Sequence, residues 1–192
     1  MKNNLIVLLY GMPASGKYTM AKRLQKKGAL LLDNHYFHDF VKPFIEVPDE
    51  EIEDYFDSIS KMKMEFFDIL RKFYPKTKAV TYVFTSVIIE DEGGRKEIES
   101  IIDLAADINA EFVPIELICN AETLKARCQT EYRKERGKIS NPEKIDKLLK
   151  KYKLIKLEHP NKLSIDVSDL DEDKTFQKIK EFLVKFNKEA NQ

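Results

Sequence analysis

The sequence has little that would cross-link the chain or place it in a membrane. Its 192 residues include only two cysteines, Cys119 and Cys128, which are too few for a disulfide scaffold or a four-cysteine zinc site. The first apolar run covers only residues 5–10, shorter than the core of a signal peptide, and no run approaches the roughly 18 residues of a membrane span. We therefore expect a cytoplasmic protein with reduced thiols and no membrane partner.

An excess of charge of one sign is also missing. The chain has 33 Lys+Arg and 33 Asp+Glu, so its net charge is zero, which argues against a surface built for nucleic acid. The balance hides a local asymmetry. Residues 39–57 carry eight acids and one lysine, whereas residues 125–156 carry twelve basic residues and four acids. If both segments border one cleft, the cleft has an acidic and a basic side.

Apolar segments with the pattern of buried strands alternate with segments of helical period. The expected strands are residues 5–10, 29–32, 79–85, 112–119 and 163–167, and the expected helices are 19–27, 48–73, 95–110, 121–136, 143–157 and 171–187. Strands separated by helices predict right-handed crossovers and a parallel sheet covered on both faces. There is no repeat and no linker, so we expect one α/β domain over residues 1–192.

A glycine-rich segment follows the first expected strand and reads GMPASGKYT, residues 11–19. It contains G-x-x-x-x-G-K between a strand and a helix, the context of a phosphate-binding (Walker A) loop. Glycines let successive N–H groups turn inward, and the following helix directs its positive end at the same phosphate oxygens. A simple glycine turn is the alternative, but the flanking elements favour nucleotide binding. The predicted nucleotide-binding residues here are Gly11, Pro13, Ala14, Ser15, Gly16, Lys17, Tyr18 and Thr19.

The loop departs from the usual pattern at one position. A Ser or Thr that ligates Mg²⁺ normally follows the lysine, but Tyr18 stands there, and its phenol cannot place oxygen where the short hydroxyl would. We expect ATP and Mg²⁺ as cofactors, with the metal held by phosphate oxygens, water and a carboxylate elsewhere. No residue set in the sequence identifies the metal ligands.

Further motifs give the chain a resemblance to a known group. Residues 34–39 read NHYFHD, Arg127 and Arg133 follow the fourth expected strand, and residues 137–140 read GKIS. With the loop, these motifs resemble the small P-loop kinases, which include shikimate kinase, gluconate kinase, chloramphenicol phosphotransferase and nucleoside monophosphate kinases. The similarity is greatest to a bacterial branch of unassigned substrate labelled shikimate kinase-like or AAA-family ATPase.

The resemblance implies a fold and a set of roles. The fold would be a three-layer P-loop NTPase fold with a five-stranded parallel sheet of the nucleoside-monophosphate-kinase type. A helical substrate excursion would cover about residues 41–73 and a short lid about residues 133–142. Arg127 and Arg133 would contact the nucleotide, and Arg133 would assist catalysis with Lys17.

Polar residues at the ends of the second and third strands are the candidates for the acceptor side. Asp33 would lie across the cleft from the loop and address the acceptor hydroxyl or a metal-bound water, unless it forms an Asx turn or helix cap. Two weaker metal hypotheses involve the His35–His38–Asp39 group and the acids Glu90 and Asp91 before a helix. The predicted substrate-binding residues are Asn34, His35, Asp39, Thr85 and Lys138.

Together these features predict an ATP-dependent phosphotransferase acting on a small hydroxyl-bearing metabolite. The alternatives are a nucleotide-binding regulatory protein, which Tyr18 favours, and a simple ATPase. The guanine motif N-K-x-D is missing, which argues against GTP. The acidic segment 39–57 favours a neutral or cationic acceptor over a mononucleotide.

Overall fold

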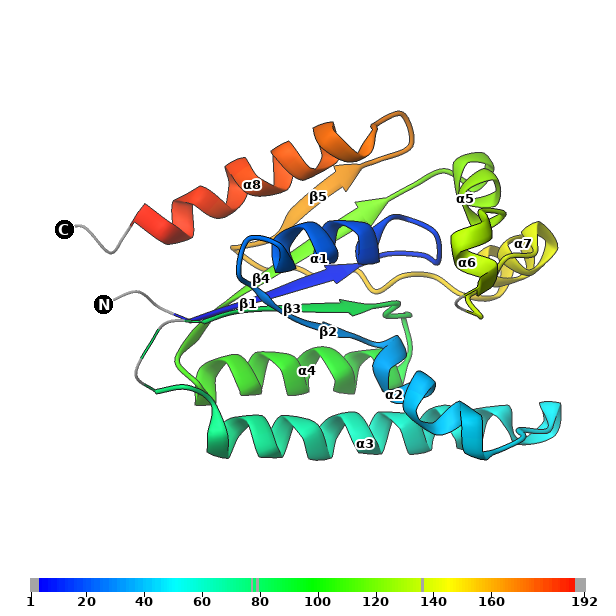
Figure 1. Ribbon diagram of the computed structural model, residues 1–192, viewed down its shortest axis with the longest axis horizontal. Helices are drawn as coiled ribbons and strands as arrows, with labels where there is room; N and C mark the ends of the chain where they lie inside the picture. The colour runs from blue at the N-terminus through cyan, green and yellow to red at the C-terminus, as the bar shows by residue number, and fades with distance from the viewer. Residues whose placement is uncertain (1–3, 77, 79, 136, 189–192) are drawn as a thin grey trace.

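A computed structural model describes residues 4–76, 78, 80–135 and 137–188 of the chain. Its strands form one five-stranded parallel sheet in the order β2-β3-β1-β4-β5 (Figure 1). The elements in chain order are β1 (Asn4–Tyr10), α1 (Lys17–Gln25), β2 (Leu30–Asp33), α2 (His35–Val41), η1 (Lys42–Phe44), η2 (Asp49–Glu51), α3 (Ile52–Phe73), β3 (Thr81–Ser86), α4 (Glu92–Asp107), β4 (Ala110–Ile118), α5 (Ala121–Cys128), α6 (Glu131–Glu135), α7 (Pro142–Lys151), β5 (Leu163–Asp166) and α8 (Glu172–Lys188).

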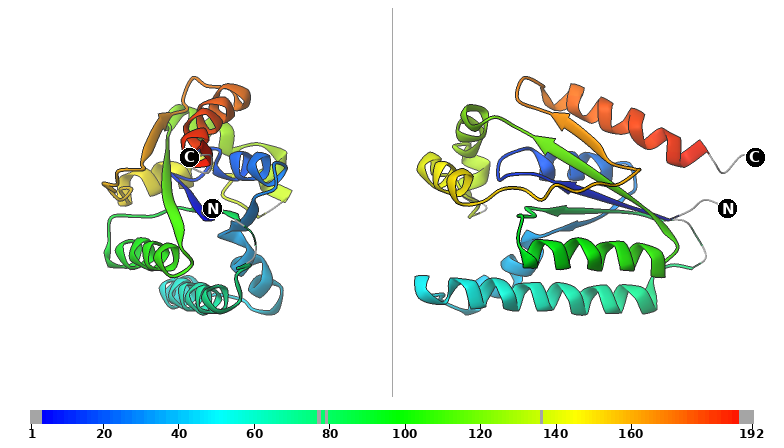
Figure 2. Two further views of the ribbon diagram at one scale, coloured as in Figure 1. Left: turned by 90° about the vertical axis from the view of Figure 1, so that its left-hand side faces the viewer. Right: turned by 180° about the vertical axis from the view of Figure 1, so that it is seen from behind.

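The three-layer arrangement confirms the predicted fold. Helices α1 and α8 cover one face of the sheet, and α3 and α4 cover the other (Figures 1 and 2). Strand β1 lies in the middle, and its side chains alternate between the two cores. Leu5, Val7 and Leu9 pack on the α1–α8 side, while Ile6 and Leu8 pack on the α3–α4 side. Because both faces are buried, the strand is apolar throughout rather than alternating.

The carboxyl ends of the strands meet at one edge of the sheet, and most of the polar residues singled out above follow them. Helices α2, α5, α6 and α7 gather at this edge (Figure 1). A third small apolar cluster, of Ala14, Leu124, Cys128 and Ile145, joins the segment after β1 to α5 and α7. In the described part of the chain, no helix is long and apolar enough to cross a membrane.

Two expectations about helices were wrong. Residues 121–136 do not form one helix, because α5 ends at Cys128 and α6 begins at Glu131. The Thr130 hydroxyl donates to the Arg127 carbonyl at 3.4 Å, and such a side-chain bond to the preceding turn competes with continued helix. Arg136, the last residue of the expected helix, lies outside the described residues.

Helix α2 was not predicted at all. Its seven residues, HYFHDFV, show no clear helical period, and no side-chain cap begins the helix. Tertiary contacts hold it instead: His38 is buried, and its ring packs against Tyr55 and Phe56 of α3. The other element boundaries differ from the predicted ones by a few residues, except that α7 ends at Lys151 rather than near 157. Ala79, the predicted start of the third strand, lies outside the described residues.

Candidate active site

The segment between β1 and α1 has the backbone of a phosphate-binding loop. Gly11 has φ 154°, and a Cβ there would lie 2.5 Å from the Leu117 carbonyl oxygen, so only glycine fits. Ala14 adopts φ 69°, a conformation unusual for a residue with a side chain. Gly16, with φ 96°, is the N-cap of α1, and no described side chain caps the helix there. Gly16 borders open space, since a Cβ there would meet nothing within 4 Å. The first N–H groups of an α-helix have no partner within the helix, so this end of α1 is suited to an anion.

Lys17 lies folded over this loop. Its Nζ donates to the carbonyl oxygens of Gly11 at 2.7 Å and Met12 at 2.9 Å. Burial, followed by the positive charge of Arg133, lowers the pKa of Lys17 to about 7; the Asp33 carboxylate opposes this shift and the Lys138 ammonium adds to it. Because burial and nearby positive charge destabilise the Lys17 ammonium, an anion that enters the loop would stabilise it.

Four buried side-chain oxygens have no hydrogen-bond partner among the described residues, and two of them belong to residues singled out from the sequence. These two are Ser15 Oγ in the loop and Asn34 Oδ1 after β2. Buried polar atoms without partners are rare and carry a desolvation cost.

Asp33 ends β2 and is almost fully buried, at 3% exposure. It lies opposite Thr85 in the ladder between β2 and β3, and the Thr85 hydroxyl donates to its Oδ1 at 2.6 Å. The backbone N–H of Asn34 in turn donates to Thr85 Oγ1 at 3.3 Å. The structure thus brings Asp33, Asn34 and Thr85 together, as their places at adjacent strand ends predicted. Asp33 is not the helix cap that was one alternative, since Asn34 is the N-cap of α2.

Lys138 reaches the same carboxylate from the segment that follows α6. Its Nζ lies 3.4 Å from Asp33 Oδ2 and 4.2 Å from the centroid of the Tyr18 ring. The backbone places it there: the N–H of Lys138 donates to the Arg133 carbonyl and that of Gly137 donates to the Lys134 carbonyl. This pair of bonds, with Gly137 at φ 58°, is a Schellman turn that ends α6.

Arg133 completes the positive side of the site. Its Nε donates to the Ile139 carbonyl at 3.1 Å, and burial lowers its pKa from the usual value. Its charge acts on Lys17, as do those of Lys138 and Asp33, so three cations and one carboxylate interact in this region. The resulting excess of positive charge suits a polyphosphate.

The side chain of Arg127 is directed elsewhere. It donates to the carbonyl oxygens of Val167 at 2.8 Å and Leu170 at 3.1 Å, in the turn between β5 and α8. Arg127 therefore ties α5 to this turn. A contact from Arg127 to the nucleotide stays a prediction.

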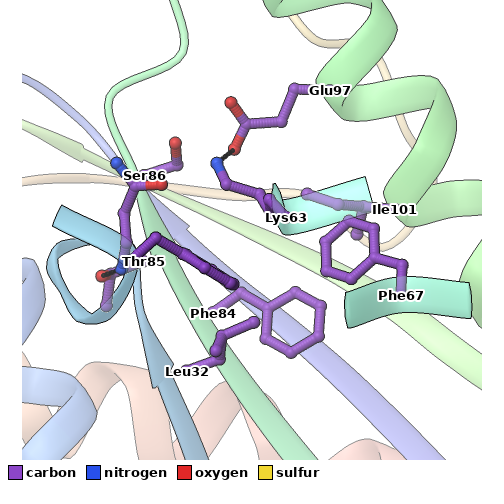
Figure 3. A pocket seen from close by; sticks show the side chains of 10 residues that line it. Leu32, Lys63, Phe67, Phe84, Thr85, Ser86, Glu97 and Ile101 are labelled. Atoms are coloured by element: carbon purple, nitrogen blue, oxygen red, sulfur yellow. Dashed lines mark hydrogen bonds and ion pairs between the residues drawn. The ribbon is translucent and has the colours of Figure 1, made fainter. Parts of the chain in front are cut away.

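A small pocket lies on the α3–α4 side of β3, near the carboxyl end of that strand (Figure 3). Its cavity of about 10 Å³ has room for about one water. The ring planes of Phe67 and Phe84 stack at 12°, with centroids 5.6 Å apart, and form one wall. The lining residues are Leu32, Asn34, Phe37, Lys63, Phe67, Phe84, Thr85, Ser86, Glu97 and Ile101.

Sequence reasoning missed the two charged residues of this pocket. Lys63 of α3 donates to Glu97 of α4 at 2.9 Å, and both side chains are mostly buried (Figure 3). A signal was present in the sequence, because Ile59, Lys63 and Phe67 follow one another at four-residue intervals on one helix face. A lysine between two apolar residues of a buried stripe is rarely left without a charged partner.

The histidines of the N-H-x-x-x-D segment do not form a metal site. His38 Nδ1 is 2.8 Å from the Tyr55 hydroxyl, and burial, followed by the charges of His35, Lys42 and Lys63, lowers the His38 pKa to about 4. Burial and the charge of Lys138 also lower the pKa of His35. Contacts of His35 and Asp39 with substrate stay predictions.

The residues at the site do not fit a conventional magnesium centre. The described residues contain no group of three His, Cys, Asp or Glu side chains that could hold a metal ion. Asp91 instead caps α4 by accepting from the Gly94 N–H, and Glu90 pairs with Arg95. The hydroxyl that usually ligates the metal is replaced by the Tyr18 ring, with the Lys138 ammonium over it.

Comparison with solved structures identifies P-loop small-molecule kinases among the structural neighbours. No protein-family model and no curated protein matches the chain. A protein from Chloroflexus aurantiacus superposes with a TM-score of 0.66 at 16% identity, covering 96% of this chain and 98% of its own. Shikimate kinase from Acinetobacter baumannii, solved with shikimate, has a TM-score of 0.54 at 18% identity, with 97% and 96% covered. APS kinase from Mycobacterium tuberculosis, solved with AMPPNP and APS, has a TM-score of 0.52 at 16% identity, with 96% and 99% covered. At these identities the similarity establishes the fold.

Proposed function

We propose that this protein transfers the γ-phosphoryl group of ATP to a hydroxyl of a small metabolite. The observation that carries the proposal is the convergence of Lys17, Arg133 and Lys138 on a helix N-terminus and one buried carboxylate. Phosphoryl transfer needs mainly positioning and stabilisation of negative charge, and this site offers both. The kinases that share the fold support the same chemistry.

Each part of the site has a role in the proposed reaction. The N–H groups of the loop and the start of α1 bind the phosphates, and Lys17 leaves the loop carbonyls to contact the β- and γ-phosphates. Arg133 stabilises charge on the transferring group. Asp33, oriented by the Thr85 hydroxyl, accepts the proton of the attacking hydroxyl or aligns that hydroxyl.

The acceptor would enter the pocket that Thr85 lines, and the Thr85 hydroxyl is bonded to Asp33. The stacked rings of Phe67 and Phe84 favour an acceptor with an apolar face, and the Lys63–Glu97 pair offers both a donor and an acceptor. A strongly anionic acceptor would lie against the Glu97 carboxylate, so we propose a neutral, zwitterionic or cationic hydroxyl compound. The pocket must widen to admit it, since its present space is that of one water.

Two features support a location in a reducing compartment. The proposed substrate is ATP, and the two cysteines, Cys119 and Cys128, form no disulfide. Cytoplasmic localisation is therefore part of the proposal.

The proposal is tested by an activity screen with a chemical readout. The full chain is incubated with ATP and pools of hydroxylated metabolites, nucleosides and nucleotides, and mass spectrometry follows the gain of one phosphoryl group. We expect one pool to yield a phosphorylated product. Asp33→Asn should slow its formation about 100-fold or more while leaving ATP affinity within a few-fold. Lys134→Gln, on the exposed side of α6 and paired with Glu131, is the matched control.

Tyr18 favours a second function, nucleotide binding without transfer, in a regulatory role. Tight ATP binding that Lys17→Ala abolishes and Asp33→Ala preserves, with no product from any pool, would support that alternative. ADP release that is independent of every added compound would instead indicate a simple ATPase.

A further inference from the structure

The Lys138 ammonium lies between the ring of Tyr18, the residue after the loop lysine, and the Asp33 carboxylate. In a metal-binding P-loop site the metal lies between the residue after the loop lysine and a carboxylate across the cleft. Here that residue is Tyr18 and that carboxylate is Asp33. Lys138 Nζ is 4.2 Å from the centroid of the first and 3.4 Å from Oδ2 of the second.

We propose that Lys138 supplies the positive charge beside Tyr18 that a divalent cation otherwise supplies, so that ATP binds without Mg²⁺. The inference rests on the proposed binding of ATP at residues 11–19. In this proposal Tyr18 binds the Lys138 ammonium, because the face of its aromatic ring attracts a cation where a metal-ligating hydroxyl usually stands.

The lid backbone fixes the position of this cation. Lys138 is the residue that follows the left-handed Gly137 in the turn that ends α6, and its N–H is bonded to the Arg133 carbonyl. The side chain has only 7% of its surface exposed, and that of Asp33 only 4%. A lysine buried to this extent needs a partner, and Asp33 is the carboxylate within reach.

The arrangement also explains why a bound metal would be disfavoured. A divalent cation placed beside Tyr18 would meet the Lys138 ammonium and share Asp33 with it, so the two positive charges would compete. An incoming triphosphate would instead add anions to a site that already holds three cations and one carboxylate. The nucleotide can therefore exchange its metal ion for the side chains of the protein.

The test measures the affinity for ATP by titration calorimetry in EDTA and in excess Mg²⁺. For the wild-type protein we expect dissociation constants that agree within about threefold. Lys138→Gln should weaken binding about tenfold in EDTA, because it removes one charge-assisted contact, and Mg²⁺ should recover most of that loss. Lys138→Arg should keep the wild-type behaviour, and Lys134→Gln is the control for lid charge. Tyr18→Thr combined with Lys138→Gln should show the largest gain from Mg²⁺.

Several results would overturn the inference. One is wild-type binding that is about tenfold or more tighter with Mg²⁺. Another is a Lys138→Gln variant, shown to be folded by its thermal transition, that loses affinity equally in both buffers or not at all. Either outcome leaves the proposed kinase function standing. Absence of ATP binding in both buffers would overturn the inference together with the proposed function.

Discussion

The lowered pKa of Lys17 predicts that ATP binding is coupled to proton uptake. In the free protein the pKa is about 7, because the ammonium is buried and lies near the charges of Arg133 and Lys138. Phosphate anions favour the protonated form, so the pKa rises on binding. Above pH 7 most of the free protein has lost the Lys17 proton that the complex requires. The affinity for ATP therefore falls as the pH increases.

The magnitude follows from the fraction of Lys17 that is protonated. At pH 8 a pKa of about 7 leaves roughly a tenth of Lys17 charged, so binding takes up about 0.9 proton. Between pH 7 and pH 9 the dissociation constant should increase about 50-fold, or about 2.3 kcal/mol. The nearby histidines His35 and His38 have lowered pKa values and titrate below this range.

Calorimetry with AMPPNP in buffers of different ionisation enthalpy measures both the dissociation constant and the number of protons taken up on binding. Lys17→Arg is the matched variant, since arginine keeps its charge throughout the range and should remove the slope wherever binding survives. A wild-type dissociation constant that changes less than about fivefold between pH 7 and pH 9, with no proton uptake at pH 8, would refute the argument.

Three further predictions concern stability. The His38 pKa of about 4 lies below the usual 6.5, so on acidification the unfolded chain takes up a proton at His38 before the folded protein does. Lowering the pH from 7.5 to 4.5 should therefore reduce the free energy of unfolding, measured by urea titration, by about 2.5 kcal/mol. The variant His38→Gln should not show this loss. Gly11→Ala should lower the free energy of unfolding by about 3 kcal/mol and abolish ATP binding, because its Cβ would meet the Leu117 carbonyl; a variant of wild-type stability would contradict that. Lys63→Met should lower the free energy of unfolding by about 3 kcal/mol, because it leaves the buried Glu97 carboxylate without its partner. The double variant Lys63→Met/Glu97→Leu should regain most of that stability. If the two substitutions instead destabilise the protein additively, the residues are not a coupled pair.

The sequence predicted the sheet and the tight glycine turn at residues 11–16 because both depend on local signals. The apolar run of β1 reflects burial on two faces, and the spacing of Gly11, Gly16 and Lys17 reflects backbone geometry within one turn. The meeting of Asp33 with Thr85 was predictable for a related reason, since parallel strands end at one edge of a sheet.

Other parts of the site depend on contacts between segments distant in sequence. Lys138 lies 105 positions from Asp33, and only the folded lid shows that the two are paired. Helix α2 owes its stability to packing on α3, which its own seven residues do not encode. The break between α5 and α6 falls at residues 129 and 130, where the Thr130 hydroxyl bonds to the preceding turn, and the apolar spacing does not show this local competition.

The central claim is that this site transfers phosphoryl groups from ATP to a hydroxyl acceptor. Its most direct test is the rate of ADP release by the full chain, measured in a coupled assay with and without the acceptor found by the activity screen. The account predicts release that depends on the acceptor, saturates with it, and falls about 100-fold or more in Asp33→Asn at unchanged ATP affinity. Release at the same rate without acceptor, or equal rates in the wild-type protein and Asp33→Asn, would contradict it.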